Sequence, residues 1–234
     1  MMLKSILQDN KSFFIPQLLL FILGSYPLLA YNKVNLLIQL NSYHHPVLDH
    51  LFYYITFLGS TAAYALLIVV LFTMKQDSRA LLIGLGSFIL MSIIIQGLKR
   101  VEFFEQSRPM GLIPLEASLH LVKGVVHKTY WSFPSGHAGS IFTATCLIYL
   151  MAPTKSWWLS LFLCLLACTV AYSRLYLCQH FYRDIYIGAL IGTCTTIAVY
   201  AYLQHWQGPV WLDQTPLALL PVKWQQKIEQ LLPF

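Results

Sequence analysis

The chain has 234 residues, of which 57% are hydrophobic and only 10% are charged, and its formal net charge is +6. Soluble domains are about a quarter charged, so this composition excludes an ordinary soluble domain and indicates a protein that lies in a lipid bilayer. The basic residues are scattered between apolar segments rather than gathered in a run. Their distribution argues against a nucleic-acid partner and favours phospholipid head groups or an anionic substrate.

The apolar segments, taken in chain order, predict helices that cross a membrane. Most approach the roughly 20 residues that a helix needs to cross the hydrocarbon core, and the fourth and fifth are shorter. The polar N-terminal segment lacks a signal-peptide pattern, so we expect the first helix to be retained. The predicted transmembrane helices are 14–31, 51–74, 80–98, 138–152, 157–172 and 184–203. The predicted fold is therefore all-α: one polytopic membrane helical bundle with six transmembrane helices, forming a single domain over residues 1–234.

The linkers between the predicted helices are of two kinds, which alternate along the chain. The linkers KQDSR and PTKS are only a few residues long, whereas those over 32–50, 99–137 and 173–183 are longer and richer in polar residues. With six spans, all the longer loops lie on one side of the membrane and both termini lie on the other. Catalytic and binding residues concentrate on loops held by a rigid scaffold, so we expect the active site on the loop-rich side.

Lys and Arg are divided almost evenly between the two sides, with seven on the side of the termini and eight on the loop-rich side. Three of those eight, Lys99, Arg108 and Arg174, belong to polar clusters that chemistry can hold there. Without them, the positive-inside rule places both termini in the cytoplasm. We therefore expect a bacterial cytoplasmic (inner) membrane protein whose active site faces the periplasm or the outside.

The C-terminal segment has a different pattern from the spanning helices. Trp224 and Ile228 recur at helical spacing, while Lys223 and Lys227 lie off that stripe. An amphipathic helix of this kind lies along a membrane surface rather than across it. We predict an interfacial helix over about 215–233.

Three polar clusters stand at the mouths of predicted helices on the loop-rich side: KRVEFFEQSRP, FPSGH and SRLYLCQHFYRD. Charged groups near a membrane are costly, and they usually mark function. Lys99, Arg108 and Arg174 suit an anionic ligand because Lys and Arg bind phosphate oxygens. Ser135 and Gly136 come just before the fourth predicted helix, so their backbone N–H groups can point at the same anion.

Two histidines in these clusters, His137 and His180, supply groups for proton transfer and nucleophilic attack. His180 and Asp184 are four residues apart, so they would share one face of a helical turn. A carboxylate bonded to one imidazole nitrogen leaves the other nitrogen free to attack. Two histidines in different environments can act as nucleophile and as acid then base. The set predicts phosphoryl transfer through a phosphohistidine, with cationic side chains stabilising the transition state.

These residues make the chain resemble the type 2 phosphatidic acid phosphatase superfamily, the integral-membrane lipid phosphate phosphatases. That family is recognised by a Lys followed at a distance by Arg-Pro, then by PSGH, then by SR-x5-H-x3-D. The second motif stands intact over 134–137, and the third stands intact from Ser173 to Asp184. The first motif departs from the pattern, because Lys99 and Arg100 both stand further from Arg108 than the family spacing allows. We assign Lys99 to this position, with Arg100 as the alternative.

The resemblance implies a role for each matching residue. His180 would be the nucleophile, Asp184 its orienting partner and His137 the acid that protonates the leaving oxygen. The phosphate would be bound by Lys99, Arg108, Ser135, Gly136 and Arg174. Family members need no metal, so we expect no metal and no other cofactor. Two further histidines, His120 and His127, are expected to contact the substrate head group instead of a metal.

The predicted function is hydrolysis of a membrane lipid phosphate, either a monophosphate or a diphosphate. Candidate substrates are undecaprenyl diphosphate, phosphatidylglycerophosphate, phosphatidic acid and lipid A phosphate. One alternative is a lipid phosphotransferase, in which an alcohol or sugar replaces water. Another is a non-catalytic binder or transporter of lipid phosphates, although charges at helix mouths and a sequence without repeats are atypical of transporters.

Overall fold

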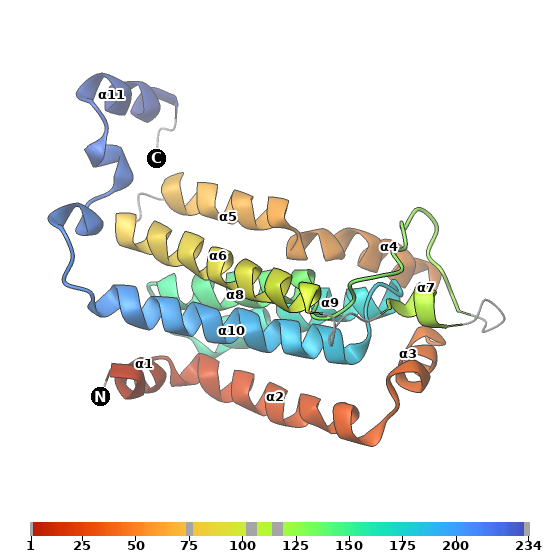
Figure 1. Cartoon of the computed structure of the whole chain (residues 1–234). Helices are drawn as coiled ribbons and strands as arrows, with labels where there is room; N and C mark the ends of the chain where they lie inside the picture. The colour runs from red at the N-terminus through yellow and green to blue at the C-terminus, as the bar shows by residue number, and fades with distance from the viewer. Residues whose placement is uncertain (1, 74–76, 102–106, 114–118, 232–234) are drawn as a thin grey trace.

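The structure is a computed structural model that describes residues 2–73, 77–101, 107–113 and 119–231. Its regular elements over these ranges are all helical, which confirms the predicted all-α class. The long helices run side by side, with the longer connections at one end of the bundle and both termini at the other (Figure 1). The α-helices are α1 (Met2–Asp9), α2 (Lys11–Ala30), α3 (Lys33–Asn41), α4 (Pro46–Ile55), α5 (Thr61–Thr73), α6 (Ser78–Arg100), α7 (Pro109–Leu112), α8 (Gly136–Met151), α9 (Trp157–Tyr176), α10 (Tyr182–His205) and α11 (Val222–Leu231).

By length and composition, the described residues supply four helices that can cross a membrane: α2, α6, α9 and α10. A bent pair, Pro46–Gly59 with Thr61–Phe72, makes a fifth if it is one span. The predicted six spans are therefore not confirmed. The remaining prediction, 138–152, corresponds to α8, whose 16 residues reach only about 24 Å against a hydrocarbon core of about 30 Å. This helix need not match the bilayer because most of its side chains are buried by other helices.

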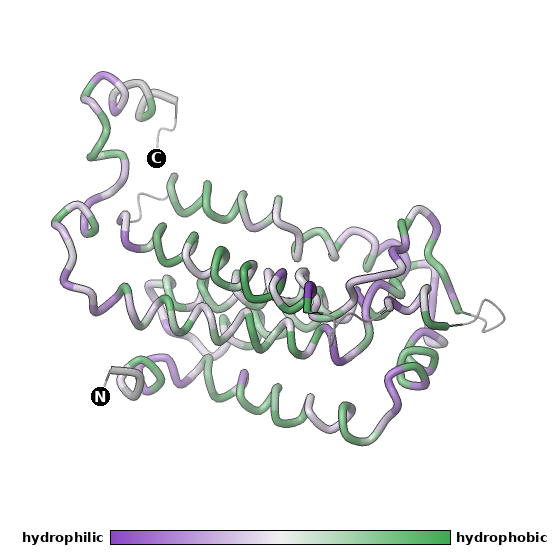
Figure 2. The backbone as a smooth tube through the Cα atoms, in the orientation of Figure 1, coloured by the Kyte–Doolittle hydropathy of each residue, from purple (hydrophilic) through white to green (hydrophobic). Residues whose placement is uncertain are grey.

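The outer surface of the bundle is apolar. Leu23 and Leu29 of α2 and Ile93 of α6 are among its exposed large hydrophobic side chains. Hydrophobic colour follows the helices, whereas hydrophilic colour gathers in the connections and near the termini (Figure 2). Soluble monomers rarely expose a continuous apolar surface of this kind. The chain is an integral membrane protein.

The second predicted span, 51–74, is bent by 57° where α4 meets α5. A short 3-10 turn, η1 (Thr56–Gly59), lies at the bend and packs against α8 and α9. Only glycine fits at Gly59, because a Cβ there would lie 2.9 Å from the backbone oxygen of His137. The bend therefore brings η1 directly against the first turn of α8.

α8 and α10 pack backbone to backbone. A Cβ on Gly188 would lie 2.4 Å from the Ser135 oxygen, and one on Gly192 would lie 2.3 Å from the Gly139 oxygen. Small residues allow this closeness between helices in a membrane. The Ser135 backbone N–H also donates to the Asp184 carbonyl at 2.9 Å. The crossing therefore fixes the start of α8 against the start of α10.

The C-terminal segment is attached to the end of the bundle that carries the termini. Arg79 at the start of α6 pairs with Asp213 at 2.9 Å and also donates to the Trp206 carbonyl. The predicted helix over about 215–233 is not continuous. A 3-10 turn, η4 (Pro216–Leu219), is followed by Pro221 and then by α11, and residues 232–234 lie outside the described part of the chain. Proline lacks the N–H that a continuous helix would need at that point.

Candidate active site

A cavity of about 520 Å³ opens at the end of the bundle where the longer connections meet. Its walls come from η1, α6, the start of α8, the end of α9 and the turn before α10 (Figure 1). The predicted site residues that line it are Lys99, Arg108, Gly136, His137, Arg174 and His180, and Lys128 and Gln179 join them. The three polar clusters that the sequence singled out therefore meet in one cavity.

The PSGH segment leads into the first turn of α8, as predicted. The backbone N–H groups of Ser135 and Gly136, however, have different surroundings. The Ser135 N–H is bonded to Asp184 and its hydroxyl caps the helix by accepting from Ala138 N at 3.4 Å. Ser135 is fully buried and is not part of the cavity wall, so the expectation that its N–H points at an anion is wrong. Gly136 does line the cavity, and a Cβ there would meet open space.

His180 lies in the turn before α10 rather than on the helix, while Asp184 is the third residue of α10. The predicted shared helical face is therefore replaced by a turn. The Asp184 carboxylate reaches back to accept from Phe181 N at 3.0 Å and from the Ser132 hydroxyl. This cap aims the carboxylate at His180, whose Nδ1 lies 3.6 Å from Oδ2. That separation is slightly too long for a hydrogen bond.

The environment of His180 keeps its imidazole neutral. The side chain is buried, and burial lowers the pKa of His180 to about 3, although the Asp184 carboxylate opposes the shift. Within the described residues, Nδ1 has no hydrogen-bond partner. A small rotation would bond it to Asp184, and catalytic hydrogen bonds are often long before substrate binds. Nε2 would then be the nitrogen available for attack.

The two arginines are held by one glutamine. Arg108 Nη1 donates to the Gln179 carbonyl at 2.9 Å, and the Gln179 side-chain oxygen lies 3.4 Å from Arg108 and 3.5 Å from Arg174. Arg174 also donates to Thr56 on η1 at 2.8 Å. Burial lowers the pKa of Arg108, but a guanidinium stays charged because its ordinary pKa is far above neutrality.

One N–H donor of the two arginines, Nε of Arg174, is left without a hydrogen bond among the described residues. Arg174 Nε is buried and has no hydrogen-bond partner in the part of the chain that the structure describes. Buried donors without partners are rare in proteins. An anion in the cavity would satisfy it.

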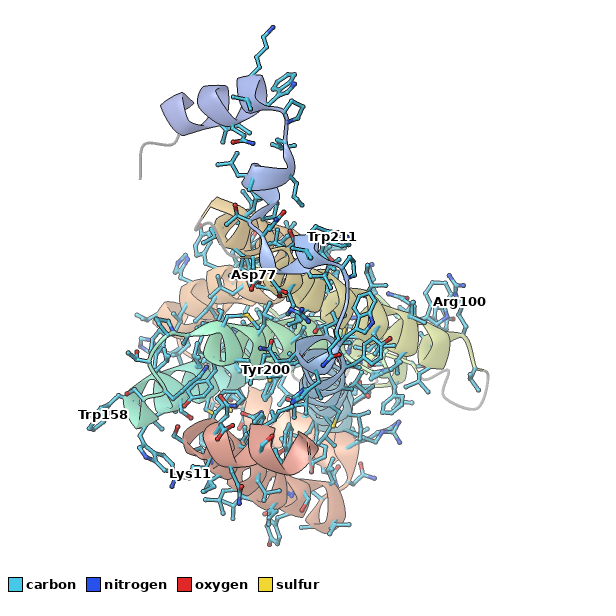
Figure 3. All side chains as sticks on the ribbon, turned by 90° about the vertical axis from the view of Figure 1, so that its left-hand side faces the viewer. Lys11, Asp77, Arg100, Trp158, Tyr200 and Trp211 are labelled. Atoms are coloured by element: carbon cyan, nitrogen blue, oxygen red, sulfur yellow. The ribbon has the colours of Figure 1, made fainter. Side chains whose placement is uncertain are left out.

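Lys99 and Arg100 occupy different places, although they are neighbours. Lys99 lines the cavity and donates from Nζ to the Trp131 carbonyl at 3.2 Å. Arg100 is exposed and projects away from the bundle (Figure 3). The geometry therefore favours Lys99 for the cation position of the first motif.

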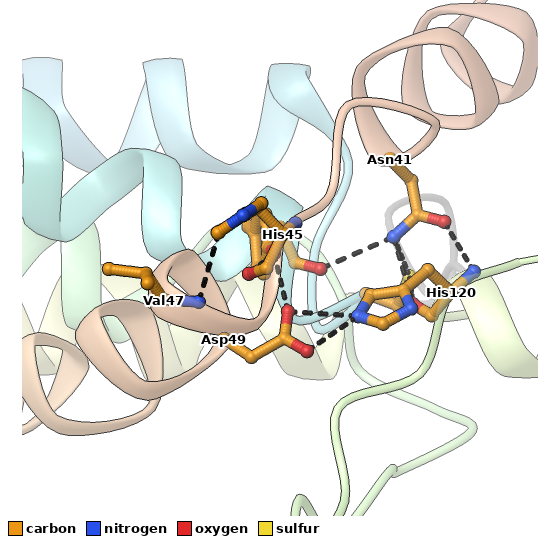
Figure 4. Close-up of polar contacts among 7 residues, drawn as sticks. Asn41, His45, Val47, Asp49 and His120 are labelled. Carbon is orange, nitrogen blue, oxygen red and sulfur yellow. Dashed lines mark hydrogen bonds and ion pairs between the residues drawn. The ribbon is translucent and has the colours of Figure 1, made fainter.

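The segment over 119–131 contributes Val126 and Lys128 to the cavity lining. Polar contacts of His120 with Asn41 and Asp49 hold this segment in place (Figure 4). Asn41 bonds both backbone groups of His120, donating to its carbonyl at 3.0 Å and accepting from its N–H at 2.7 Å. The His120 ring pairs with Asp49 at 2.9 Å and stacks on His44. His120 therefore holds the loop and does not line the cavity.

His127, on the same segment, contacts Gln179 through Nδ1 at 3.3 Å. Burial lowers its pKa. It is not part of the cavity wall, whereas its neighbour Lys128 is. The expected head-group contact by His127 stays a prediction, and Lys128 lies in the cavity itself.

Sequence reasoning missed several supporting residues. Gln179 lies inside the third motif, directly before His180, and its polar side chain at that position could have indicated a role in the site. Ser132 stood two residues before the PSGH segment and offered a weaker one. No sequence pattern indicated Thr56 or Asn41, because their contacts join segments that are far apart in the chain.

Together these groups can bind a phosphate and transfer it. Four cationic side chains, those of Lys99, Arg108, Lys128 and Arg174, line this space together with Gly136 and two imidazoles. A neutral imidazole whose Nδ1 faces a carboxylate is a nucleophile, and a second imidazole can move a proton to the leaving group. Positive charge fixed in a buried site stabilises the developing charge of phosphoryl transfer.

Comparisons with known proteins agree with this arrangement. A family model described as the PAP2 superfamily matches residues 80–207. The lipid A 4'-phosphatase of Bacteroides thetaiotaomicron is 42% identical over 62 residues, which make up 26% of this chain and 27% of that protein. The chain thus aligns with only about a quarter of this curated relative.

Two solved structures share the fold. The crystal structure of Aquifex aeolicus LpxE superposes with a TM-score of 0.60 at 28% identity, covering 74% of this chain and 98% of that one. A transmembrane PAP2-type phosphatidylglycerolphosphate phosphatase from Bacillus subtilis superposes with a TM-score of 0.58, covering 83% of this chain and 98% of that one. The second is 21% identical and supports the fold alone.

Proposed function

Because the chain belongs to the PAP2 superfamily, we propose that it hydrolyses the phosphate of a membrane lipid through a phosphohistidine formed on His180. The observation that carries this proposal is the convergence of Lys99, Arg108 and Arg174 on a cavity that also contains both motif histidines. A binder needs the cations but not the paired imidazoles. The histidine geometry therefore favours catalysis.

The proposed reaction has two steps. His180 Nε2 attacks phosphorus while the bond from phosphorus to the lipid oxygen breaks, and His137 donates a proton to that oxygen. Water then attacks the phosphohistidine, and His137 takes a proton from the water as the P–N bond breaks. Asp184 orients His180 and balances its charge in the intermediate. Lys99, Arg108 and Arg174 bind the phosphate oxygens throughout.

The cavity also supports a lipid as substrate. Beyond the cations, its wall continues along α6 through Ile95 and Met91 to Phe88. From Lys99 to Phe88 a helix rises about 16 Å at 1.5 Å per residue. The phosphate would lie near water and the tail would follow the apolar wall into the bilayer. Among the candidate lipids, lipid A phosphate is favoured by the name of the Bacteroides relative.

The decisive experiment measures phosphate release by purified protein in detergent with EDTA present, over a panel of the four candidate lipids. We expect release from at least one lipid, and a loss of at least a thousandfold in kcat for His180→Ala, because the nucleophile is gone. His50→Ala makes the same change at an exposed histidine outside the cavity. This control variant should release phosphate at the wild-type rate.

Trapping tests the intermediate directly. Enzyme quenched during turnover of a phosphate-labelled lipid should carry acid-labile label, and His180→Ala should carry none. If the wild-type enzyme is active but carries no label after quenching, the proposed phosphohistidine intermediate is wrong. Product that forms only when an alcohol is added would instead identify a phosphotransferase.

A further inference from the structure

A second groove, of about 480 Å³, lies at the same end of the bundle as the active-site cavity. It runs between the end of α2, the start of α3 and the start of α10 (Figure 1). Leu28, Leu36 and Ile187, one from each helix, form its apolar wall. Two cations, Lys33 and Arg183, stand in the same lining.

The groove is separate from the active site. The two cavities share no lining residue. The buried rings of Phe133 and Phe181 stand beside the catalytic segments, and each carries a groove cation on its face. Lys33 Nζ lies 5.1 Å from the Phe181 centroid, and the Arg183 guanidinium lies 4.8 Å from the Phe133 centroid. A phosphate bound in the groove therefore cannot be the one that His180 attacks.

The chemistry of the groove matches one kind of ligand. Its described lining contains two cations and no carboxylate. Lys33 follows the end of α2 by three residues and Arg183 is the second residue of α10, so both stand at helix ends while Ile187 lies one turn deeper. Cations at the head-group level above an apolar wall are complementary to an anionic head group with an acyl chain.

We propose that this groove binds an anionic phospholipid of the surrounding bilayer. Its phosphate contacts Lys33 and Arg183, and one acyl chain lies along Leu28, Leu36 and Ile187. The occupant is a bilayer lipid and not the substrate, because the described lining of the groove contains no histidine that could attack a phosphate. The proposal does not depend on the reaction that the protein catalyses.

Native mass spectrometry of the detergent-purified protein tests the proposal with phosphatidylglycerol and phosphatidylcholine of identical chains. Wild type should bind the first more tightly. The double variant Lys33→Gln/Arg183→Gln should weaken phosphatidylglycerol binding roughly 10- to 30-fold, from about 1 kcal/mol per basic residue. Lys123→Gln, which removes an exposed cation outside the groove, is the control and should bind as wild type does.

Ile187→Trp fills the groove while it keeps both cations, so it tests the apolar wall even if the double variant folds poorly. It should also weaken binding. Unchanged binding by Ile187→Trp, or equal affinity for the two lipids, would overturn the proposal. Inorganic phosphate added to fill the catalytic cavity should leave lipid binding unchanged, and displacement by phosphate would mean that the lipid sits in the active site instead.

Discussion

At the scale of single residues, Gln179 supplies a shared hydrogen-bond acceptor for two neighbouring arginines. Arg108 and Arg174 carry like charges and repel each other, yet both line the same cavity. The amide oxygen of Gln179 lies near both guanidinium groups, and its amide nitrogen donates to the Val126 carbonyl at 3.0 Å. One buried side chain thus couples the two arginines to the segment over 119–131.

Gln179→Leu should raise KM for the lipid phosphate more than it lowers kcat, because the arginines would lose their common acceptor while the histidines remain. We expect a fall in kcat/KM of about 10- to 100-fold, equivalent to one or two hydrogen bonds to charged groups. Steady-state kinetics would measure it. Gln39→Leu makes the same change at an exposed position and should be silent; equal kinetics for the two variants would contradict this role.

The burial of neutral His180 should make the protein less stable in acid. Its pKa is lowered from 6.5 to about 3, so between these values the unfolded chain binds a proton here and the folded chain does not. The free energy of unfolding therefore falls as the pH falls, by about 1.4 kcal/mol per pH unit from this group.

Thermal unfolding in detergent from pH 7 to pH 4 would test this dependence. His180→Gln removes the titrating group, so its unfolding temperature should decline less steeply with acid than that of wild type. His50→Gln, at an exposed site, should follow wild type. Parallel curves for wild type and His180→Gln would show that His180 is protonated in the fold.

At the scale of single residues, the motif residues could be predicted from the sequence, but the residues that hold them in place could not. His137, Arg174 and His180 could be assigned to one site because their chemistry is carried by residue type and short spacing. Ser135 was placed on the wrong contact because the partner of its N–H, Asp184, approaches from another helix. The contact of Thr56 with Arg174 depends on the bend at η1, and no local sequence pattern predicts that bend.

At the scale of elements, the crossing of α8 and α10 decides the geometry of the site. α8 carries His137 in its first turn and α10 carries Asp184 in its first turn, and the two backbones approach closely at Gly188 and Gly192. A side chain at this crossing would push apart the two helices that carry His137 and Asp184.

Gly192→Ala should therefore lower both stability and turnover. Its Cβ would lie 2.3 Å from the Gly139 oxygen, and overpacking of this kind costs about 1 to 3 kcal/mol. The unfolding temperature and kcat measure the two effects. Gly97→Ala on α6, where a Cβ meets nothing within 4 Å, should change neither, and a tolerated Gly192→Ala would contradict the packing argument.

Helix positions were largely predictable because apolar runs long enough to be helical are read directly from the sequence. The predicted span 157–172 became Trp157–Tyr176, and 80–98 became Ser78–Arg100. The bend within 51–74 was missed, because the apolar run continues through η1 without proline. The short helix α3 was missed because it lies in a loop whose polar content resembles a linker.

At the scale of the whole molecule, the arrangement separates two ends. The longer connections lie at one end of the bundle and both termini lie at the other (Figure 1). The candidate active-site cavity and the polar contacts of His120 belong to the end with the longer connections. The sequence predicted this division from alternating loop lengths, although the number of spans it assumed is not confirmed. We propose that the end with the termini is cytoplasmic, with α11 on the inner membrane surface.

A membrane-impermeant thiol reagent applied to intact cells would test this orientation. Lys123→Cys at the loop-rich end should be labelled, because its side chain is exposed outside. Trp158→Cys at the opposite end (Figure 3) is 81% exposed and should be labelled only after the cells are opened. Wild type measures the background from native cysteines, and the reverse pattern would invert the topology.

The backbone contact between α8 and α10 has a consequence for how the protein meets membranes of different thickness. Lipid-facing helices adjust to a thicker or thinner bilayer by tilting. α8 is enclosed by protein, and its backbone meets that of α10 directly at Gly188 and Gly192, so the crossing leaves little room for a tilt. The outer helix α2 can follow the bilayer while this central pair, with α6 packed against both of its helices, moves as one body. The spacing between His137 and Asp184 is therefore insulated from changes in lipid composition.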